Sequence, residues 1–334
     1  MNSRAYRGVA LAALIFLLVQ LGALALVPTF DAAGYQTIED TSDPTNSLLY
    51  IGAILVMTAL MLAAFKYNLD QLIRGIIILT SGMLAWYVFS VAVPPVVAIG
   101  LAALVSLSLL LYPEWYVIDT AGVVMGAGAA GLFGISFDVL PTIVLLTLLA
   151  VYDAISVYGT EHMLDLAEGV MDLNIPVVLV IPLTLSYSLL KDQKEAETAA
   201  ADGGPEGVDE TAESDAETES ESRGEAVSPE ANERDVFFIG LGDAVMPTVM
   251  VASGAFFLDA GNLGFSLLPA LNLAALLSMV GTFLGLGVLL WMVMKGRAHA
   301  GLPLLNGGAI GGYLLGAVLS GVSLVQALGL GPYL

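Results

Sequence analysis

The chain has 334 residues, of which 57% are hydrophobic and 12% are charged, with a formal net charge of −21 at pH 7. So large an apolar share excludes an ordinary soluble domain and predicts an all-α polytopic membrane protein. The chain has no cysteine and only two histidines, far apart at His162 and His299, which argues against disulfides, thiolate chemistry, a metal centre and a Ser-His-Asp triad. We therefore expect no metal, no other cofactor and, from the acidic charge, no nucleic acid partner.

Nine apolar segments are long enough to cross a hydrocarbon core of about 30 Å as helices. They cover approximately residues 6–27, 47–65, 71–92, 95–112, 116–135, 139–159, 236–257, 266–294 and 301–322. The first has an alternative interpretation as a cleaved signal peptide, because Arg4 and Arg7 precede an apolar run that ends in Ala23-Leu24-Ala25.

The basic residues predict how these segments are oriented in the membrane. With nine spans and a cytoplasmic N-terminus, all ten fall in cytoplasmic loops or at cytoplasmic helix ends, as the positive-inside rule requires. They are Arg4, Arg7, Lys66, Arg74, Lys191, Lys194, Arg223, Arg234, Lys295 and Arg297. We expect a multi-pass protein of the cell membrane with the 191–235 loop in the cytoplasm and the C-terminus outside.

The loop at 191–235 divides the chain into an N-terminal membrane part, 1–190, and a C-terminal membrane part, 236–334. The loop carries 16 acidic and 4 basic residues and almost no large apolar residue. This composition predicts a disordered, solvated linker and is typical of proteins from salt-loving archaea. An acidic docking tail for a basic partner is the alternative.

Two segments beside the linker are too short or too polar to span the membrane. Residues 161–174 have apolar positions at helical spacing, which predicts an amphipathic surface helix. Residues 175–182 are apolar, β-branched and bracketed by prolines, which predicts an extended strand. Residues 236–239 are a second strand candidate, although both stretches could instead be loops resting on the bilayer surface.

Two aspartates, Asp153 and Asp243, lie inside the sixth and seventh apolar segments. A carboxylate at membrane depth costs several kcal/mol and therefore indicates a functional site. Asp153 lies six residues before Gly159 and Asp243 seven residues after Val236. At about 1.5 Å per helical residue, both lie about 10 Å inside the cytoplasmic surface. Because consecutive spans often pack as neighbours, we expect the two carboxyls to face each other.

Two carboxyls near contact distance share one proton, so one can take a proton from water while the other polarises a peptide carbonyl. Gly240 and Gly242 would allow a second backbone to approach Asp243, or could serve only as a small-residue packing face. Intramembrane carboxylates also mark ion paths, so a proton- or cation-coupled transporter or channel is the alternative function. A membrane scaffold without catalysis is a third.

The aspartates stand in motifs that resemble those of a known family. Tyr152-Asp153 and Gly240-Leu241-Gly242-Asp243 are similar to the YD and GxGD motifs of presenilins and signal peptide peptidases, and residues 152–168 resemble the presenilin run after YD. Nine spans and a long loop between the aspartate helices also match, above all the archaeal presenilin-like members. The resemblance implies a presenilin-like bundle and an intramembrane aspartic endopeptidase with Asp153 and Asp243 as its catalytic dyad.

The same resemblance implies the partners and a third motif. Substrates would be transmembrane segments or signal-peptide remnants, bound as a strand beside the dyad within the bilayer; a homo-oligomer is left open. A Pro-Ala-Leu motif is expected at the ninth span, for which Pro303, Leu304 and Leu305 are the counterpart and Ala300-Gly301-Leu302 the offset alternative.

Two further polar residues have more than one interpretation. Asp119, near the cytoplasmic start of the fifth span, is either a third intramembrane carboxylate or an interfacial or helix-capping group. Asn306, near the start of the ninth span, is a candidate contact of the site.

Overall fold

The structure is a computed structural model that describes residues 3–67, 69–158, 177–184, 187–191, 236–295 and 300–333. The predicted amphipathic helix at 161–174, both histidines and nearly all of the acidic linker lie outside the described residues.

The described chain is almost entirely helical, as the apolar segments predict. The helices are α1 (Ser3–Ala32), α2 (Thr45–Lys66), α3 (Asp70–Ser90), α4 (Pro95–Leu111), α5 (Trp115–Ser136), α6 (Val139–Tyr158), α9 (Leu241–Phe257), α10 (Leu273–Val293), α11 (Leu302–Leu319) and the short α12 (Leu324–Ala327), with a final 3-10 turn, η1 (Gly331–Tyr333). Within the described ranges, seven helices have the length and apolarity to cross a membrane, and α4 and α9 are apolar but shorter, at 17 residues each. The chain is a polytopic helical membrane protein.

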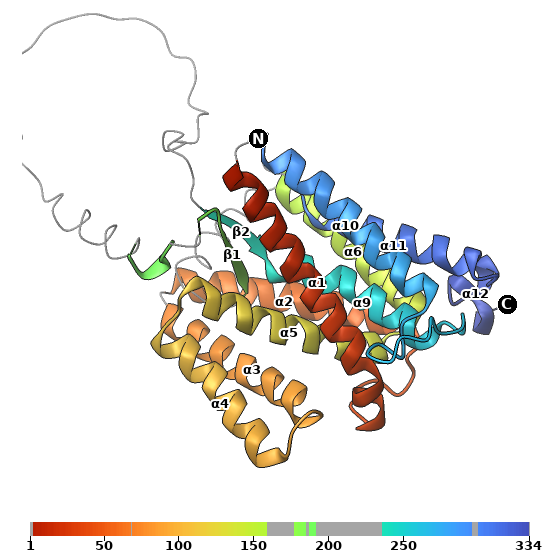
Figure 1. Cartoon of the computed structure of the whole chain (residues 1–334), viewed down its shortest axis with the longest axis horizontal. Helices are drawn as coiled ribbons and strands as arrows, with labels where there is room; N and C mark the ends of the chain where they lie inside the picture. Colours follow the sequence, from red (N-terminus) through yellow and green to blue (C-terminus); the bar gives the residue numbers. More distant parts are fainter. Residues whose placement is uncertain are drawn as a thin grey trace, which may run out of the picture.

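The helices surround a buried centre made by α5 and α9. Helix α1 packs on both, α3 and α4 form a pair beside α5, and α6, α10 and α11 pack on α9 from the other side (Figure 1). Most of α9 is buried, from Ala244 to Ala255, whereas α2 and α4 expose large apolar side chains, as lipid-facing helices do. The aspartate-bearing helices α6 and α9 are therefore neighbours, as expected.

A small sheet lies at the end of the bundle that holds the N-terminus (Figure 1). Strands β1 (Val178–Pro182) and β2 (Val236–Gly240) pair antiparallel, with Val178 opposite Gly240 and Pro182 opposite Val236. This confirms the prediction that both segments are extended, and excludes unstructured loops on the bilayer surface for these residues.

The sheet also corrects one predicted helix boundary, and a polar side chain corrects another. The span predicted to begin at residue 236 begins at Leu241, because the five residues before it pair with β1 rather than forming a helical turn. The span predicted to begin at residue 266 begins at Leu273, because the Asn272 side chain accepts a hydrogen bond from the Ala275 amide at 2.8 Å and caps the helix there.

Helices α10 and α11 pack closely through glycines. A Cβ on Gly281 would clash with the Gly308 carbonyl, and one on Gly312 would clash with the Leu277 carbonyl. Small residues that let two backbones touch are typical of helix pairs in membranes, where apolar burial does not drive association. This pairing holds the start of α11 against the rest of the bundle.

We expect Gly312→Leu to destabilise the protein by at least about 1–3 kcal/mol, because the side chain must displace the backbone of α10. Gly311→Leu is the matched control, since Gly311 is exposed and a Cβ there meets no atom within 4 Å. Thermal unfolding in detergent measures the difference. Equal melting temperatures for the two variants would contradict the close approach of the helices.

Candidate active site

Asp153 lies near the end of α6 and is buried, with 5% of its surface exposed. Its Oδ2 atom accepts a hydrogen bond of 3.0 Å from the backbone amide of Leu302, the first residue of α11. The amides of a first helical turn have no partner within their own helix. The start of α11 thus supplies a donor that orients the Asp153 carboxyl.

Asp243 is the third residue of α9, the helix that follows β2 directly. The chain changes from strand to helix at Gly240, whose φ of −61° and ψ of 135° are extended, and the Leu241 amide donates to the Val177 carbonyl at 2.7 Å. A Cβ on Gly301 would lie 3.3 Å from Asp243 Oδ1. Asp243 is therefore held at the junction of the sheet, α9 and the start of α11.

Both carboxyls approach the same backbone segment, Gly301-Leu302. Asp153 reaches it through the Leu302 amide, and Asp243 lies against Gly301. Both aspartates therefore lie next to the same two residues, but the prediction placed Asp243 seven residues inside a helix that begins at residue 236. Asp243 arrives there from the first turn of α9, after a strand.

The remaining motif residues differ in their burial and in how closely they approach the two carboxyls. Tyr152 is partly buried beside Asp153, Leu241 is buried in the core, and a Cβ on Gly240 would lie 3.6 Å from Asp243 Oδ2. Gly242 is exposed, and a Cβ there would meet nothing within 4 Å. Of the two glycines, Gly240 is therefore the one that lies against the carboxyl.

Contacts at the start of α11 favour Ala300-Gly301-Leu302, the offset alternative, as the counterpart of the Pro-Ala-Leu motif. Ala300 donates through its amide to the Tyr158 hydroxyl at 3.4 Å, and Gly301 and Leu302 contact the carboxyls. The three residues of the other alignment lie in the first turn of α11: Pro303 is partly buried, Leu304 packs against the core and Leu305 is fully buried in it.

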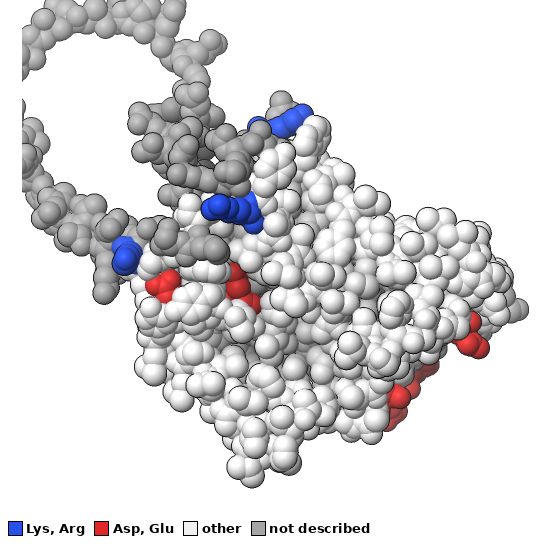
Figure 2. All heavy atoms as spheres, in the orientation of Figure 1, with Lys and Arg blue, Asp and Glu red and all other residues white. Residues whose placement is uncertain are grey.

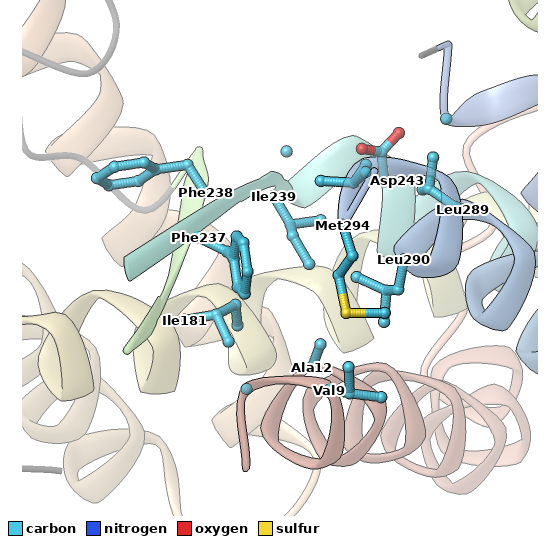
Figure 3. Close-up of a pocket in the computed structure, with 14 residues that line it drawn as sticks. Val9, Ala12, Ile181, Phe237, Phe238, Ile239, Asp243, Leu289, Leu290 and Met294 are labelled. Carbon is cyan, nitrogen blue, oxygen red and sulfur yellow. The ribbon is translucent and has the colours of Figure 1, made fainter. Parts of the chain in front are cut away.

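An apolar cavity opens beside Asp243, with a volume of about 160 Å³. Figure 3 shows Asp243 at one end and β2 along one side, with Val9 and Ala12 of α1 opposite, together with Leu290 of α10 and Met294 directly after that helix. Gly240 and Gly301 also line it. A carboxyl at the rim of an apolar cavity is an arrangement that suits a peptide with apolar side chains.

Three further polar residues lie around the site in ways that the sequence did not predict. Tyr158 was part of the presenilin-like run, but its contact with Ala300 depends on how α6 and α11 pack. Asn306 does not bind a carboxyl; its Nδ2 donates to the Leu146 carbonyl at 3.0 Å and braces α11 against α6. Asp119 is buried and binds β1 through the Val180 amide, so it neither caps a helix nor joins the other two carboxyls.

Comparisons with known proteins agree with this geometry. The family model described as "Signal-peptide peptidase, presenilin aspartyl protease" matches residues 13–322. Two solved structures of a presenilin family intramembrane aspartate protease, in space groups C222 and P2, are similar over 93% and 92% of this chain and 99% and 96% of theirs. Their identities are 31% and 32%, with TM-scores of 0.61 and 0.58. No match was found among curated proteins.

Proposed function

We propose, on the premise that the chain belongs to the family of signal-peptide peptidases and presenilin aspartyl proteases, that Asp153 and Asp243 are its catalytic dyad. The chain is an intramembrane aspartyl protease of the presenilin type. The observation that carries the assignment of the dyad is the approach of both carboxyls to the Gly301-Leu302 backbone.

The two carboxyls would work as a pair that holds one proton. The ionised carboxyl takes a proton from a water molecule as the water oxygen bonds to the peptide carbonyl carbon. The protonated carboxyl gives its proton to the carbonyl oxygen. The tetrahedral intermediate then breaks its C–N bond: the leaving nitrogen receives a proton from the carboxyl that took one, and a hydroxyl of the intermediate returns a proton to the other carboxyl as the product carbonyl forms. The Leu302 amide would keep Asp153 oriented throughout.

The substrate would be the membrane-spanning helix of another protein or of a signal-peptide remnant, unwound beside the sheet. Unwinding frees backbone groups that need partners inside a membrane. Strand β2 offers them, because it leads straight to Asp243 and is paired only with β1 among the described residues. The cavity between α1, β2 and α10 would accept apolar side chains of the substrate.

We further propose nine spans, with α4 and α9 completing the seven longer ones, and an N-terminus and 191–235 linker in the cytoplasm. On the face shown in Figure 2, the basic side chains lie at the end that carries the N-terminus and the small sheet, whereas acidic side chains lie both at that end and at the opposite one. This distribution supports the orientation by the positive-inside rule. The membrane parts would be 1–190 and 236–334.

The test is proteolysis by the purified protein in liposomes that contain a protein with one membrane-spanning helix. We expect cleavage, located by mass spectrometry inside that helix, without added metal or nucleotide. Cleavage only in the soluble parts of the substrate would contradict the proposal. Dissipation of a pH gradient with no cleavage would favour the transporter.

A further inference from the structure

Strand β1 is held from its outer side by a buried carboxyl of α5. The Oδ1 atom of Asp119 accepts a hydrogen bond of 2.8 Å from the Val180 amide, and Asp119 is 6% exposed. Its Oδ2 atom is buried with no hydrogen-bond partner in the described part of the chain. A carboxyl is costly in such a place, so the bond to β1 is the interaction that accounts for it.

The start of α5 also holds the chain that follows β1. The Glu114 carboxylate accepts from the Ser188 hydroxyl at 2.6 Å and from the Leu189 amide at 3.1 Å, and it is 4% exposed. Trp115 donates through Nε1 to the Tyr187 carbonyl at 3.1 Å. Trp115 and Asp119 are four residues apart and thus lie on one face of the helix. The start of α5 therefore binds both β1 itself and residues 187–189, which follow it.

The direction of the Val180 amide determines which strand edge is open. Neighbouring residues of a strand direct their backbone groups to opposite edges, so Val180 faces α5 while Leu179 and Ile181 face β2. Phe238 is the partner of Val180 in the antiparallel register, and its backbone groups must therefore face the outer edge of β2. The outer edge of β1 is occupied by Asp119 at Val180 and lacks a donor at Pro182.

We propose that Asp119 is a positioning residue for proteolysis: it closes the outer edge of β1, so that a substrate strand adds only to the outer edge of β2 beside Asp243. An open edge on either side of a two-stranded sheet would accept an extended peptide, and a peptide bound beside β1 would be separated from Asp243 by the sheet itself. Asp119 touches no reacting atom; it acts through β1. This inference rests on the proposed function.

Kinetics of two matched variants test the role of the carboxyl. Asp119→Leu keeps the branched shape but removes the acceptor, whereas Asp119→Asn keeps a carbonyl oxygen for the Val180 amide. For Asp119→Leu we expect KM for a single-span substrate to rise about tenfold and additional cut positions to appear. For Asp119→Asn we expect one main cut and a KM within about threefold of the wild type. Rates are divided by the active fraction, titrated with a transition-state analogue that binds two carboxyls.

A loss of folded protein alone would lower the active fraction without moving KM or the cut, so these readouts separate positioning from stability. The proposal is overturned if Asp119→Leu, per active site, keeps both the KM and the cut of the wild type, or if Asp119→Asn behaves like Asp119→Leu. A wild-type protein that does not cut at all would contradict the proposed function instead.

Cross-linking tests the open edge in the intact site, and does not depend on the folding of Asp119→Leu. The chain has no cysteine, so a single introduced one is unique. A strand added to β2 places its side chains about 5 Å from that of Phe238, which is 40% exposed. We expect Phe238→Cys to form a disulfide with a cysteine next to the cleaved bond of the substrate, and Val178→Cys on β1 not to. Equal yields at both positions would overturn the proposal.

Discussion

Replacing either aspartate by asparagine is expected to lower kcat/KM for an intramembrane substrate on the order of 10⁴-fold, because neither amide can exchange protons with water and the scissile bond. Asp153→Asn still has a carbonyl oxygen that can accept from the Leu302 amide, so the fold should be retained. Cleavage rates in liposomes, with thermal unfolding as the check on folding, measure the effect.

The matched control is Asp138→Asn. Asp138 lies between α5 and α6, away from the candidate site, and burial raises the pKa of its carboxyl while the hydrogen bond from the Val139 amide lowers it. It is thus another partly desolvated carboxyl, and its replacement should leave cleavage within about twofold of the wild type, because it precedes the first residue of α6 whereas Asp153 lies near the other end of that helix. Activity in Asp153→Asn or Asp243→Asn comparable to this control would contradict the dyad.

The second large effect is expected at Gly301, where a bulky side chain should lower kcat/KM more than about 100-fold with little loss of stability. A Cβ there lies 3.3 Å both from Asp243 Oδ1 and from Leu289 Cδ2, so a single methyl fits only after small shifts and a larger group must displace the carboxyl. Displacement of a reacting group by about 1 Å is enough for a loss of that size. The measurement compares kcat/KM for Gly301→Leu and the wild type.

Two controls accompany Gly301→Leu. Gly301→Ala should retain activity within about tenfold, because the backbone at Gly301 is right-handed helical and the added methyl group only tightens the contacts with the Asp243 and Leu289 side chains by a few tenths of an ångström. Gly307→Leu, on the exposed side of the same helix, meets nothing within 4 Å and should leave activity unchanged. If Gly301→Leu cut as fast as Gly307→Leu, the contact between α11 and Asp243 would not matter for catalysis.

Much of the fold is predictable because lipid imposes a simple rule on the sequence. A backbone in hydrocarbon must satisfy its own hydrogen bonds, so long apolar runs become helices, and their lengths can be counted. The boundary at Leu241 could not be predicted in the same way. Residues 236–239 are as apolar in a strand as in a helix, and only their pairing with β1 decides between the two.

The candidate site was predictable in its carboxyls and less so in its surroundings. Asp153 and Asp243 stand out because charged groups are rare within apolar segments. The choice between Ala300-Gly301-Leu302 and Pro303-Leu304-Leu305 depends on which turn of α11 meets α6 and α9, which is a property of helix packing. The bond from Asp119 to Val180 joins residues 61 positions apart and has no local pattern that could reveal it.

The most direct measurement of the central claim compares kcat/KM for the two single asparagine variants with that of the double variant, Asp153→Asn with Asp243→Asn. If the two carboxyls act as one unit on one water molecule, each single variant should be as inactive as the double, because removing one member already removes the function of the other. If instead the fold loss in kcat/KM of the double variant equals the product of the losses of the two single variants, the two carboxyls act independently, and the account is contradicted.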